Sequence, residues 1–200
     1  AVVIAWILAR TRVPFRHALE FLFWGAYMIP AIPTAIAWIT LLDPSIGLLN
    51  VALRGIPIIG DHPLNIFSVG GIVWVNLMGH GIAIKVMLLT PAFRNMDASL
   101  EEAARVGGVS TFGTMLKVTL PLMATPMILV FAFHLLRAFN SFETEYLIGI
   151  PFNFYVYSTK IYELLSDVVP HYGEATVLAS ITLLLIVLIV PLQRWVIQRR

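Results

Sequence analysis

The sequence contains no cysteine and few charged residues. Because none of its 200 residues is a cysteine, a disulfide framework, a thiolate metal site and a cysteine nucleophile are all excluded. Charged residues make up only 12% of the chain, against about 25% in an ordinary soluble domain. Hydrophobic residues make up 59%, and the mean hydropathy is +0.88. This composition favours a membrane protein over a soluble one.

Short motifs of nucleotide-binding and hydrolytic sites are also missing. The chain contains no G-x-x-x-x-G-K-[ST], G-x-G-x-x-G, H-E-x-x-H or G-x-S-x-G. It therefore has no P-loop for ATP, and we expect neither catalytic residues nor a cofactor. The histidines show no spacing typical of a metal site, so no metal is expected. They are His17, His62, His80, His134 and His171.

What is present is a series of long apolar runs. Such runs of about 20 residues are long enough to cross a membrane as helices, and in lipid the backbone must bond to itself. The sequence predicts an all-α, polytopic membrane bundle. Its helices are expected at Ala1–Ala9, Leu19–Leu42, Ile66–Leu89, Val118–Phe139 and Gly173–Ile197. The first run is cut short, which indicates a piece of a longer protein, and Pro30 and Pro33 interrupt the second.

Basic residues indicate the orientation of this bundle. Alternate loops carry most of the Lys and Arg, and such loops are cytoplasmic by the positive-inside rule. These residues are Arg10, Arg12, Arg16, Arg94, Arg105, Lys117, Arg194, Arg199 and Arg200. The carboxy terminus is therefore predicted to be cytoplasmic. The net charge of +2 is explained by this topology, and no basic stripe indicates nucleic acid.

The cytoplasmic segment between the third and fourth apolar runs is unusually structured. Ser99 and Glu102 have the spacing of a capping box, which predicts a helix starting there. Gly107 and Gly108 are expected to end this helix, because glycine adopts the backbone conformation of a helix C-terminus. Ser110 can then cap a second short helix.

Residues of this segment resemble the EAA loop of ABC importer permeases. The family pattern is E-A-A, three residues, G, nine residues, I, one residue, L-P. The matching residues are Glu102, Ala103, Ala104, Gly108, Val118, Leu120 and Pro121. Val118 replaces the isoleucine, and Gly107 and Val109 flank Gly108 where many members carry a polar residue and alanine. These are small changes in a specific pattern.

The resemblance implies a type I ABC importer permease, with residues 1–200 forming its five-helix transmembrane domain and a cytoplasmic coupling helix. It implies a transport protein, not an enzyme, in a bacterial inner membrane, surrounded by lipid. The implied protein partners are ATP-hydrolysing subunits, a second permease domain and an extracytoplasmic solute-binding protein. Glu102, Ala103, Ala104, Gly108, Leu120 and Pro121 would couple the chain to the ATPase. Glu102 alone could instead cap its own helix.

A few polar residues interrupt the apolar runs. Asn76 and His80 lie four residues apart, so a helix places them on one face, and His134 lies in the next run. Polar residues within a membrane are candidates for a solute pathway. The simpler alternative is that these three residues bond to each other or to free carbonyls. Lys85 is expected to extend towards the cytoplasmic interface.

Two outer loops are expected to be ordered. The stretch Asp43–Asn65 is rich in Gly and Pro and predicts turns. The stretch Phe154–Val168 alternates apolar and polar residues in a pattern that predicts an amphipathic helix at the outer interface. Glu143 and Glu145 could contact a solute receptor, although an acidic solvated loop is the more common explanation.

Two other function classes are alternatives to an ABC importer permease. A secondary transporter or channel half driven by an ion gradient would need carboxylates near the membrane middle, and none lies deep in an apolar run. A membrane enzyme would need a reactive constellation, and none is present. For the solute, one run is similar to permeases of ferric-iron and polyamine importers, with ferric iron first and polyamine or thiamine next. This run comprises Phe142, Glu143, Leu147, Gly149, Pro151, Val156, Ser158, Thr159, Ile161, Tyr162, Pro170, Tyr172, Gly173 and Ala175.

Overall fold

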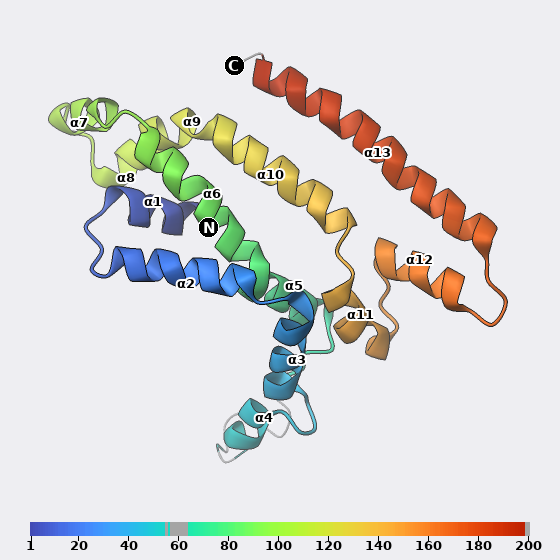
Figure 1. The fold of residues 1–200 in the computed structure, drawn as a ribbon. Coiled ribbons are helices and arrows are strands. Elements are labelled where there is room, and N and C mark those ends of the chain that lie inside the picture. Colours follow the sequence, from blue (N-terminus) through green and yellow to red (C-terminus); the bar gives the residue numbers. More distant parts are fainter. Residues whose placement is uncertain (55, 57–63, 199–200) are drawn as a thin grey trace.

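The computed structural model describes residues 1–54, 56 and 64–198, and this part of the chain is helical throughout, without strands (Figure 1). Asp61, His62, Arg199 and Arg200 lie outside it. The α-helices are α1 (Val2–Arg10), α2 (Arg16–Met28), α3 (Ala31–Leu42), α4 (Leu48–Leu53), α5 (Val69–Asn76), α6 (Ile82–Asn95), α7 (Ser99–Val106), α8 (Thr111–Thr114), α9 (Leu120–Leu122), α10 (Ala124–Phe139), α11 (Glu143–Gly149), α12 (Tyr157–Ser166) and α13 (Tyr172–Gln198). Two π-helical turns, η1 (Leu77–Gly81) and η2 (Met115–Thr119), and a 3-10 turn, η3 (Ile150–Phe152), connect some of them.

The second predicted span is sharply bent. The sequence predicts one helix over Leu19–Leu42 that Pro30 and Pro33 interrupt, but α2 and α3 meet at an angle of 97°. Ile29 between them is extended, because a residue that precedes proline is disfavoured in helical conformation. Pro33 lies in the first turn of α3, where its missing N–H breaks no helical bond.

The fourth predicted span is bent as well. The helical stretch Thr111–Leu122 and α10 meet at 68°, with Met123 at the corner. Pro121 lies in the first turn of α9. Among the described residues, Val69–Asn95 alone is long and apolar enough to cross a membrane unaided, and counting each bent pair as one span gives up to three.

A π-turn divides the long stretch Val69–Asn95. Inside η1, Gly79 has the non-helical backbone angles φ −77° and ψ −109°. A Cβ at Gly79 would lie 3.2 Å from the Cγ2 atom of Thr34, and one at Gly81 would lie 2.4 Å from the carbonyl oxygen of Asn76. These glycines therefore permit the close approach of α3 and the tight local turn.

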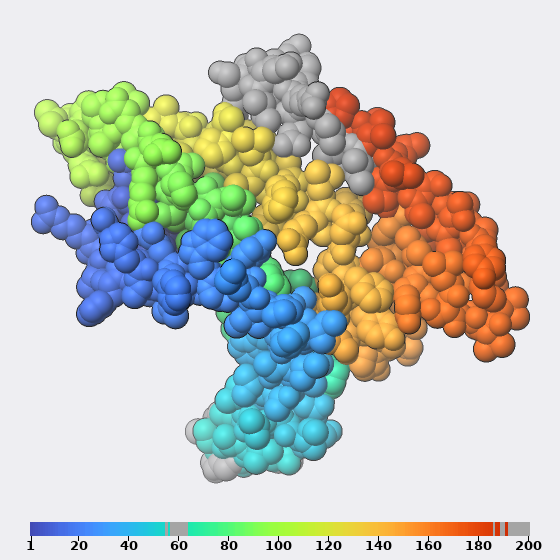
Figure 2. Space-filling model, in the orientation of Figure 1, coloured from blue at the N-terminus to red at the C-terminus, as the bar shows by residue number. Residues whose placement is uncertain are grey.

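The buried apolar residues form two clusters. One lies where α3, α5 and α11 meet and contains Ala35, Ile66, Ile72, Val75 and Ile148. The other joins α1, α6 and the α9–α10 corner and contains Ala5, Leu89, Phe93 and Met123. Figure 2 shows α3 and α4 projecting as an arm from the rest of the molecule. Many large apolar side chains elsewhere are exposed, as expected for a chain whose surface faces lipid or a partner.

The described residues of the two predicted loops are ordered, while residue 55 and residues 57–63 of the first lie outside the described part of the chain. Asn50 of α4 is fully buried, and its amide donates to the carbonyl oxygens of Asp43 and Leu64, each at 2.8 Å. Helix α12 falls inside the predicted stretch 154–168, and it packs against the start of α13. That α12 lies at the outer membrane interface remains a prediction.

Candidate coupling segment and translocation cavity

The short helix α7 begins differently from the prediction. Ala98 occupies the N-cap position and provides no side-chain bond, so the expected capping box of Ser99 and Glu102 is wrong. Asp97 takes that part instead, because its Oδ1 accepts the backbone N–H of Ser99 at 2.9 Å. The backbone and hydroxyl of Ser99 lower the pKa of the Asp97 carboxyl, and Arg10 nearby adds a smaller effect in the same direction.

The end of α7 agrees with the prediction. Gly107 follows the last helical residue, and Gly108 has a φ of +81°, the left-handed conformation that favours glycine. The backbone N–H of Val109 donates to the carbonyl oxygen of Ala104 at 3.0 Å, which closes the helix end. Ser110 then caps α8 by accepting the N–H of Gly113.

One face of α7 is open to a partner. Glu102, Ala103 and Gly108 are exposed, and Ala104 is half-buried. Because capping does not occupy Glu102, its carboxylate is free to meet a basic group. Leu120 and Pro121 lie apart from this face in α9, directly after η2, which packs against α7. The residues that match the EAA pattern therefore fall into two groups: an exposed patch on α7, and a turn in α9 beside the η2 segment that supports α7.

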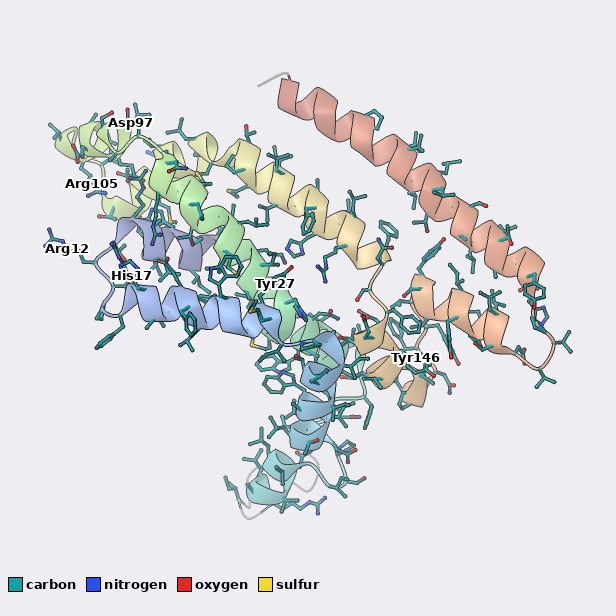
Figure 3. The ribbon with its side chains drawn as sticks, viewed as in Figure 1. Arg12, His17, Tyr27, Asp97, Arg105 and Tyr146 are labelled. Carbon is teal, nitrogen blue, oxygen red and sulfur yellow. The ribbon has the colours of Figure 1, made fainter. Side chains whose placement is uncertain are left out.

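Glu101, next to Glu102, was not singled out by the sequence analysis. It is 3% exposed, and its Oε1 accepts a 2.6 Å hydrogen bond from the hydroxyl of Thr119. Its Oε2 lies 3.8 Å from Arg10 of α1 and 3.8 Å from Arg105. Arg10 also donates to the carbonyl oxygen of Met96. Figure 3 shows Arg105 and Asp97 at this end of the molecule. Glu101 thus attaches α7 to α1 and η2. The i,i+4 spacing to Arg105 was the available sequence signal.

At the other end of α6 lies a cavity of about 590 Å³. Its lining includes Asn76, His80 and His134, so the structure brings together the three residues predicted to line a solute pathway. The side chain of Tyr27, labelled in Figure 3, packs edge-on against His80 with ring centroids 5.8 Å apart. A hollow of about 660 Å³ elsewhere is lined by the single loop 11–18. That loop carries no converging groups from other helices, so the cavity is the better candidate site.

Glu145 is buried beside this cavity, contrary to expectation. It is 5% exposed, and its Oε1 accepts a 2.9 Å hydrogen bond from the Asn76 amide, while its Oε2 accepts one of 2.7 Å from Ser141. The expectation of a solvated loop fails for Glu145 because α11 folds back against α3 and α5. Glu143, by contrast, is exposed. Asn76 also donates to the carbonyl oxygen of Ile72.

The whole sequence, residues 1–200, matches the family described as "Binding-protein-dependent transport system inner membrane component". The chain belongs to this family. The EAA-like residues and the exposed face of α7 therefore occur in a transport permease component, and not in an enzyme family.

Two curated relatives match different shares of this permease. It is 29% identical over 118 residues to the glucose import system permease protein GlcT of Saccharolobus solfataricus, covering 58% of this chain and 41% of the relative. It is 27% identical over 198 residues to a probable sulfate transport system permease protein, cysT, of Nephroselmis olivacea, covering 96% of this chain and 66% of the relative. The permease chain thus spans less than two thirds of either. Their names concern glucose and sulfate, so the expected likeness to ferric-iron and polyamine permeases is not supported.

Solved structures confirm the fold of the permease. A chain of a bacterial ABC transporter involved in the import of the acidic polysaccharide alginate superimposes with a TM-score of 0.75 at 18% identity, covering 99% of this chain and 71% of that chain. A second alginate ABC transporter, in complex with an alginate pentasaccharide-bound periplasmic protein, gives 0.78 at 20% identity, covering 96% and 68%. The all-helical membrane bundle expected from the sequence is therefore confirmed.

Two basic residues of the permease also line the cavity. Lys85 of α6 was expected to extend towards the cytoplasmic interface, but its half-buried side chain lines the cavity together with Arg137 of α10. Both lie within electrostatic range of His134. Within the described part of the chain, no group of three His, Asp or Glu side chains could hold a metal ion. The cavity lining is thus polar and partly cationic.

Proposed function

We propose that residues 1–200 form the transmembrane domain of an ABC importer, in which α7 docks on a separate ATP-hydrolysing subunit. The observation that carries this proposal is the contrast between two adjacent carboxylates on α7, one buried and one exposed. Glu101 is buried and holds α7 to α1 and η2, whereas Glu102 is exposed beside Ala103. A helix that is anchored on one side and open on the other suits a docking element.

A continuous series of contacts connects α7 with the cavity and could transmit a displacement of α7. Arg10, which contacts Glu101, belongs to α1, and α1 packs along α6 through the cluster of Ala5, Leu89 and Phe93. Further along α6 lies Lys85 in the cavity lining. A displacement of α7 would therefore move α1 and α6 together and change the cavity. Alternating access requires two such states, which ATP and the loaded receptor stabilise differently.

The importer is completed by partners that the chain itself does not contain. We propose a second permease domain, two ATPase subunits and an extracytoplasmic solute-binding protein, assembled in a bacterial inner membrane with the carboxy terminus in the cytoplasm. Exposed apolar side chains along α13, such as Leu183, Leu184 and Val187, would face lipid or the second permease domain.

The solute is better sought among sugars and sulfate than among cations. The relatives' names support this choice. Lys85 and Arg137 in the cavity lining would repel a polyamine or bare ferric iron, because like charges raise the energy of a bound cation. Ferric iron is therefore no longer the preferred solute. Mass spectrometry of the ligand bound to the neighbouring receptor would identify the solute directly.

Glu102→Lys and Gly108→Asp test the coupling role in the assembled importer. We expect both to abolish uptake and to reduce copurification of the ATPase, while the permease stays in the membrane. Glu174→Lys is a matched control, since Glu174 is an exposed carboxylate far along the chain in α13. Normal uptake in both α7 variants would refute the assignment, and so would uptake driven by an ion gradient without any ATPase.

A further inference from the structure

The cavity contains two cations that form no ion pair with any acidic group in the described part of the chain. Elsewhere in the chain, Arg94 pairs with Glu20 and Lys160 with Glu163. The side chains of Lys85 and Arg137 line the cavity, and neither makes a hydrogen bond or an ion pair within the described residues. Positive groups placed in a partly enclosed site without counter-ions attract anions.

The carboxylates of the cavity do not neutralise this pair directly. Both oxygens of Glu145 accept hydrogen bonds from the neutral donors Asn76 and Ser141. Glu143 is exposed. Asn76 and Lys85 are nine positions apart along the α5–α6 stretch, which separates them by roughly 13 Å at the rise of a helix. The negative charge of Glu145 therefore lies at one end of the cavity and the ammonium group of Lys85 lies towards the other.

His134 adds a polar group near both cations, since Lys85 and Arg137 each lie within electrostatic range of it. Its Nε2 atom is buried and has no hydrogen-bond partner in the described part of the chain. His134 lies one helical turn before Arg137 on α10, so the two share a face. A buried polar atom without a partner costs free energy, which a ligand oxygen would recover by bonding to it.

We propose that Lys85, His134 and Arg137 form an anion site through which the solute passes, and that the imported solute carries a sulfate-like or carboxylate group. This inference rests on the proposed importer function and narrows it from sugars and sulfate to anions. The shared chemistry is an oxyanion held by an ammonium group, a guanidinium group and an imidazole. A free oxyanion and an acidic sugar both provide it.

Binding to the receptor-free importer tests this site. The permease, assembled with its ATPase subunits in detergent, is dialysed against radiolabelled sulfate, glucuronate or glucose. We expect saturable binding of at least one anion and none of glucose. Lys85→Gln and Arg137→Gln should each weaken that binding at least tenfold, while Lys85→Arg keeps it. Arg16→Gln, which removes an exposed cation from the start of α2, should leave binding unchanged.

The outcomes separate the alternatives. Tighter binding of sulfate indicates a free oxyanion, and tighter binding of glucuronate indicates an acidic sugar. If neither anion binds more tightly than glucose, or if the glutamine variants bind as well as the wild type, the anion site is refuted. ATP hydrolysis by each assembled variant shows that it is folded and coupled. A complex that takes up solute with ATP but binds no anion would retain the importer function and lose only this inference.

Discussion

Replacing Glu101 with glutamine should loosen α7 from the bundle without touching its exposed face. Gln can still accept the hydroxyl of Thr119, but a hydrogen bond to a neutral group is about half as strong as one to a carboxylate, a loss of about 1 kcal/mol. The larger loss concerns Arg10, whose side chain is 11% exposed and would lose its anion.

The total can be worked from the geometry. Breaking a buried ion pair costs about 3–5 kcal/mol, but the Arg10 and Arg105 nitrogens lie 3.8 Å from the Glu101 carboxylate, too far for a hydrogen bond. The Arg105 side chain is 49% exposed, so water screens its contribution to below about 1 kcal/mol. We therefore expect Glu101→Gln to weaken the attachment of α7 by about 3 kcal/mol. This corresponds to a roughly hundredfold rise in the fraction of molecules in which α7 is detached from the bundle.

Hydrogen exchange of the assembled importer measures this directly. Amide protons of α7 exchange through local opening, so their protection should fall by up to two orders of magnitude, while α10 is unaffected. Glu102→Gln is the matched control, because the Glu102 side chain is exposed and its replacement should not change the protection of the α7 amides. If α7 in Glu101→Gln exchanges within threefold of the wild type, Glu101 does not hold the helix.

Three further predictions concern topology, the cavity and pH. Because the chain has no cysteine, Val106→Cys and Val168→Cys, which are 90% and 97% exposed, give clean labels. A membrane-impermeant maleimide should reach position 168 from outside and position 106 only after lysis, and the reverse pattern would overturn the orientation. Glu145→Leu should lower the free energy of unfolding by about 2–4 kcal/mol, since it leaves buried donors unpaired, and denaturant melts should show no such loss for the exposed Glu143→Leu. The lowered pKa of Asp97 means that its stabilising bond to α7 is complete above the unfolded pKa of about 3.9. This stabilisation is lost as the pH falls through the pKa of Asp97 in the folded protein, which lies below the unfolded value. The protection of the α7 amides against hydrogen exchange, corrected for the intrinsic exchange rate, should therefore fall in that pH range in the wild type but not in Asp97→Asn.

Local features of the coupling segment could be predicted from the sequence because their causes lie within a few residues. The glycine end of α7 and the Ser110 cap depend on residues no more than five positions apart. The start of α7 was misassigned because Asp97 accepts the Ser99 N–H that the Glu102 side chain was expected to accept. The Glu102 N–H donates to the carbonyl oxygen of Ala98 instead of the Ser99 hydroxyl, and spacing alone does not decide between these arrangements.

The features that escaped prediction depend on distant partners. Glu101 meets Thr119 across 18 positions and Glu145 meets Asn76 across 69, and hydropathy contains no information on such pairs. The bends at Ile29 and Met123 were missed for another reason: Pro30 and Pro33 marked an interruption in the second run, but neither they nor the residues around Met123 specify angles of 97° and 68°. Asn76, His80 and His134 were found because polar residues in apolar runs are rare and therefore conspicuous.

The irregular turn at Gly79 has a mechanical consequence. It divides the 27-residue stretch Val69–Asn95 into two helical segments that are held by different neighbours. The segment formed by α6 packs against α1 through Leu89 and Phe93, whereas α5 packs with Ile148 of α11. Since η1 separates them, a twist applied to the first need not be transmitted to the second. The part of the cavity lining from Asn76 to Lys85 can then change shape while α5 and α6 each keep their own packing contacts.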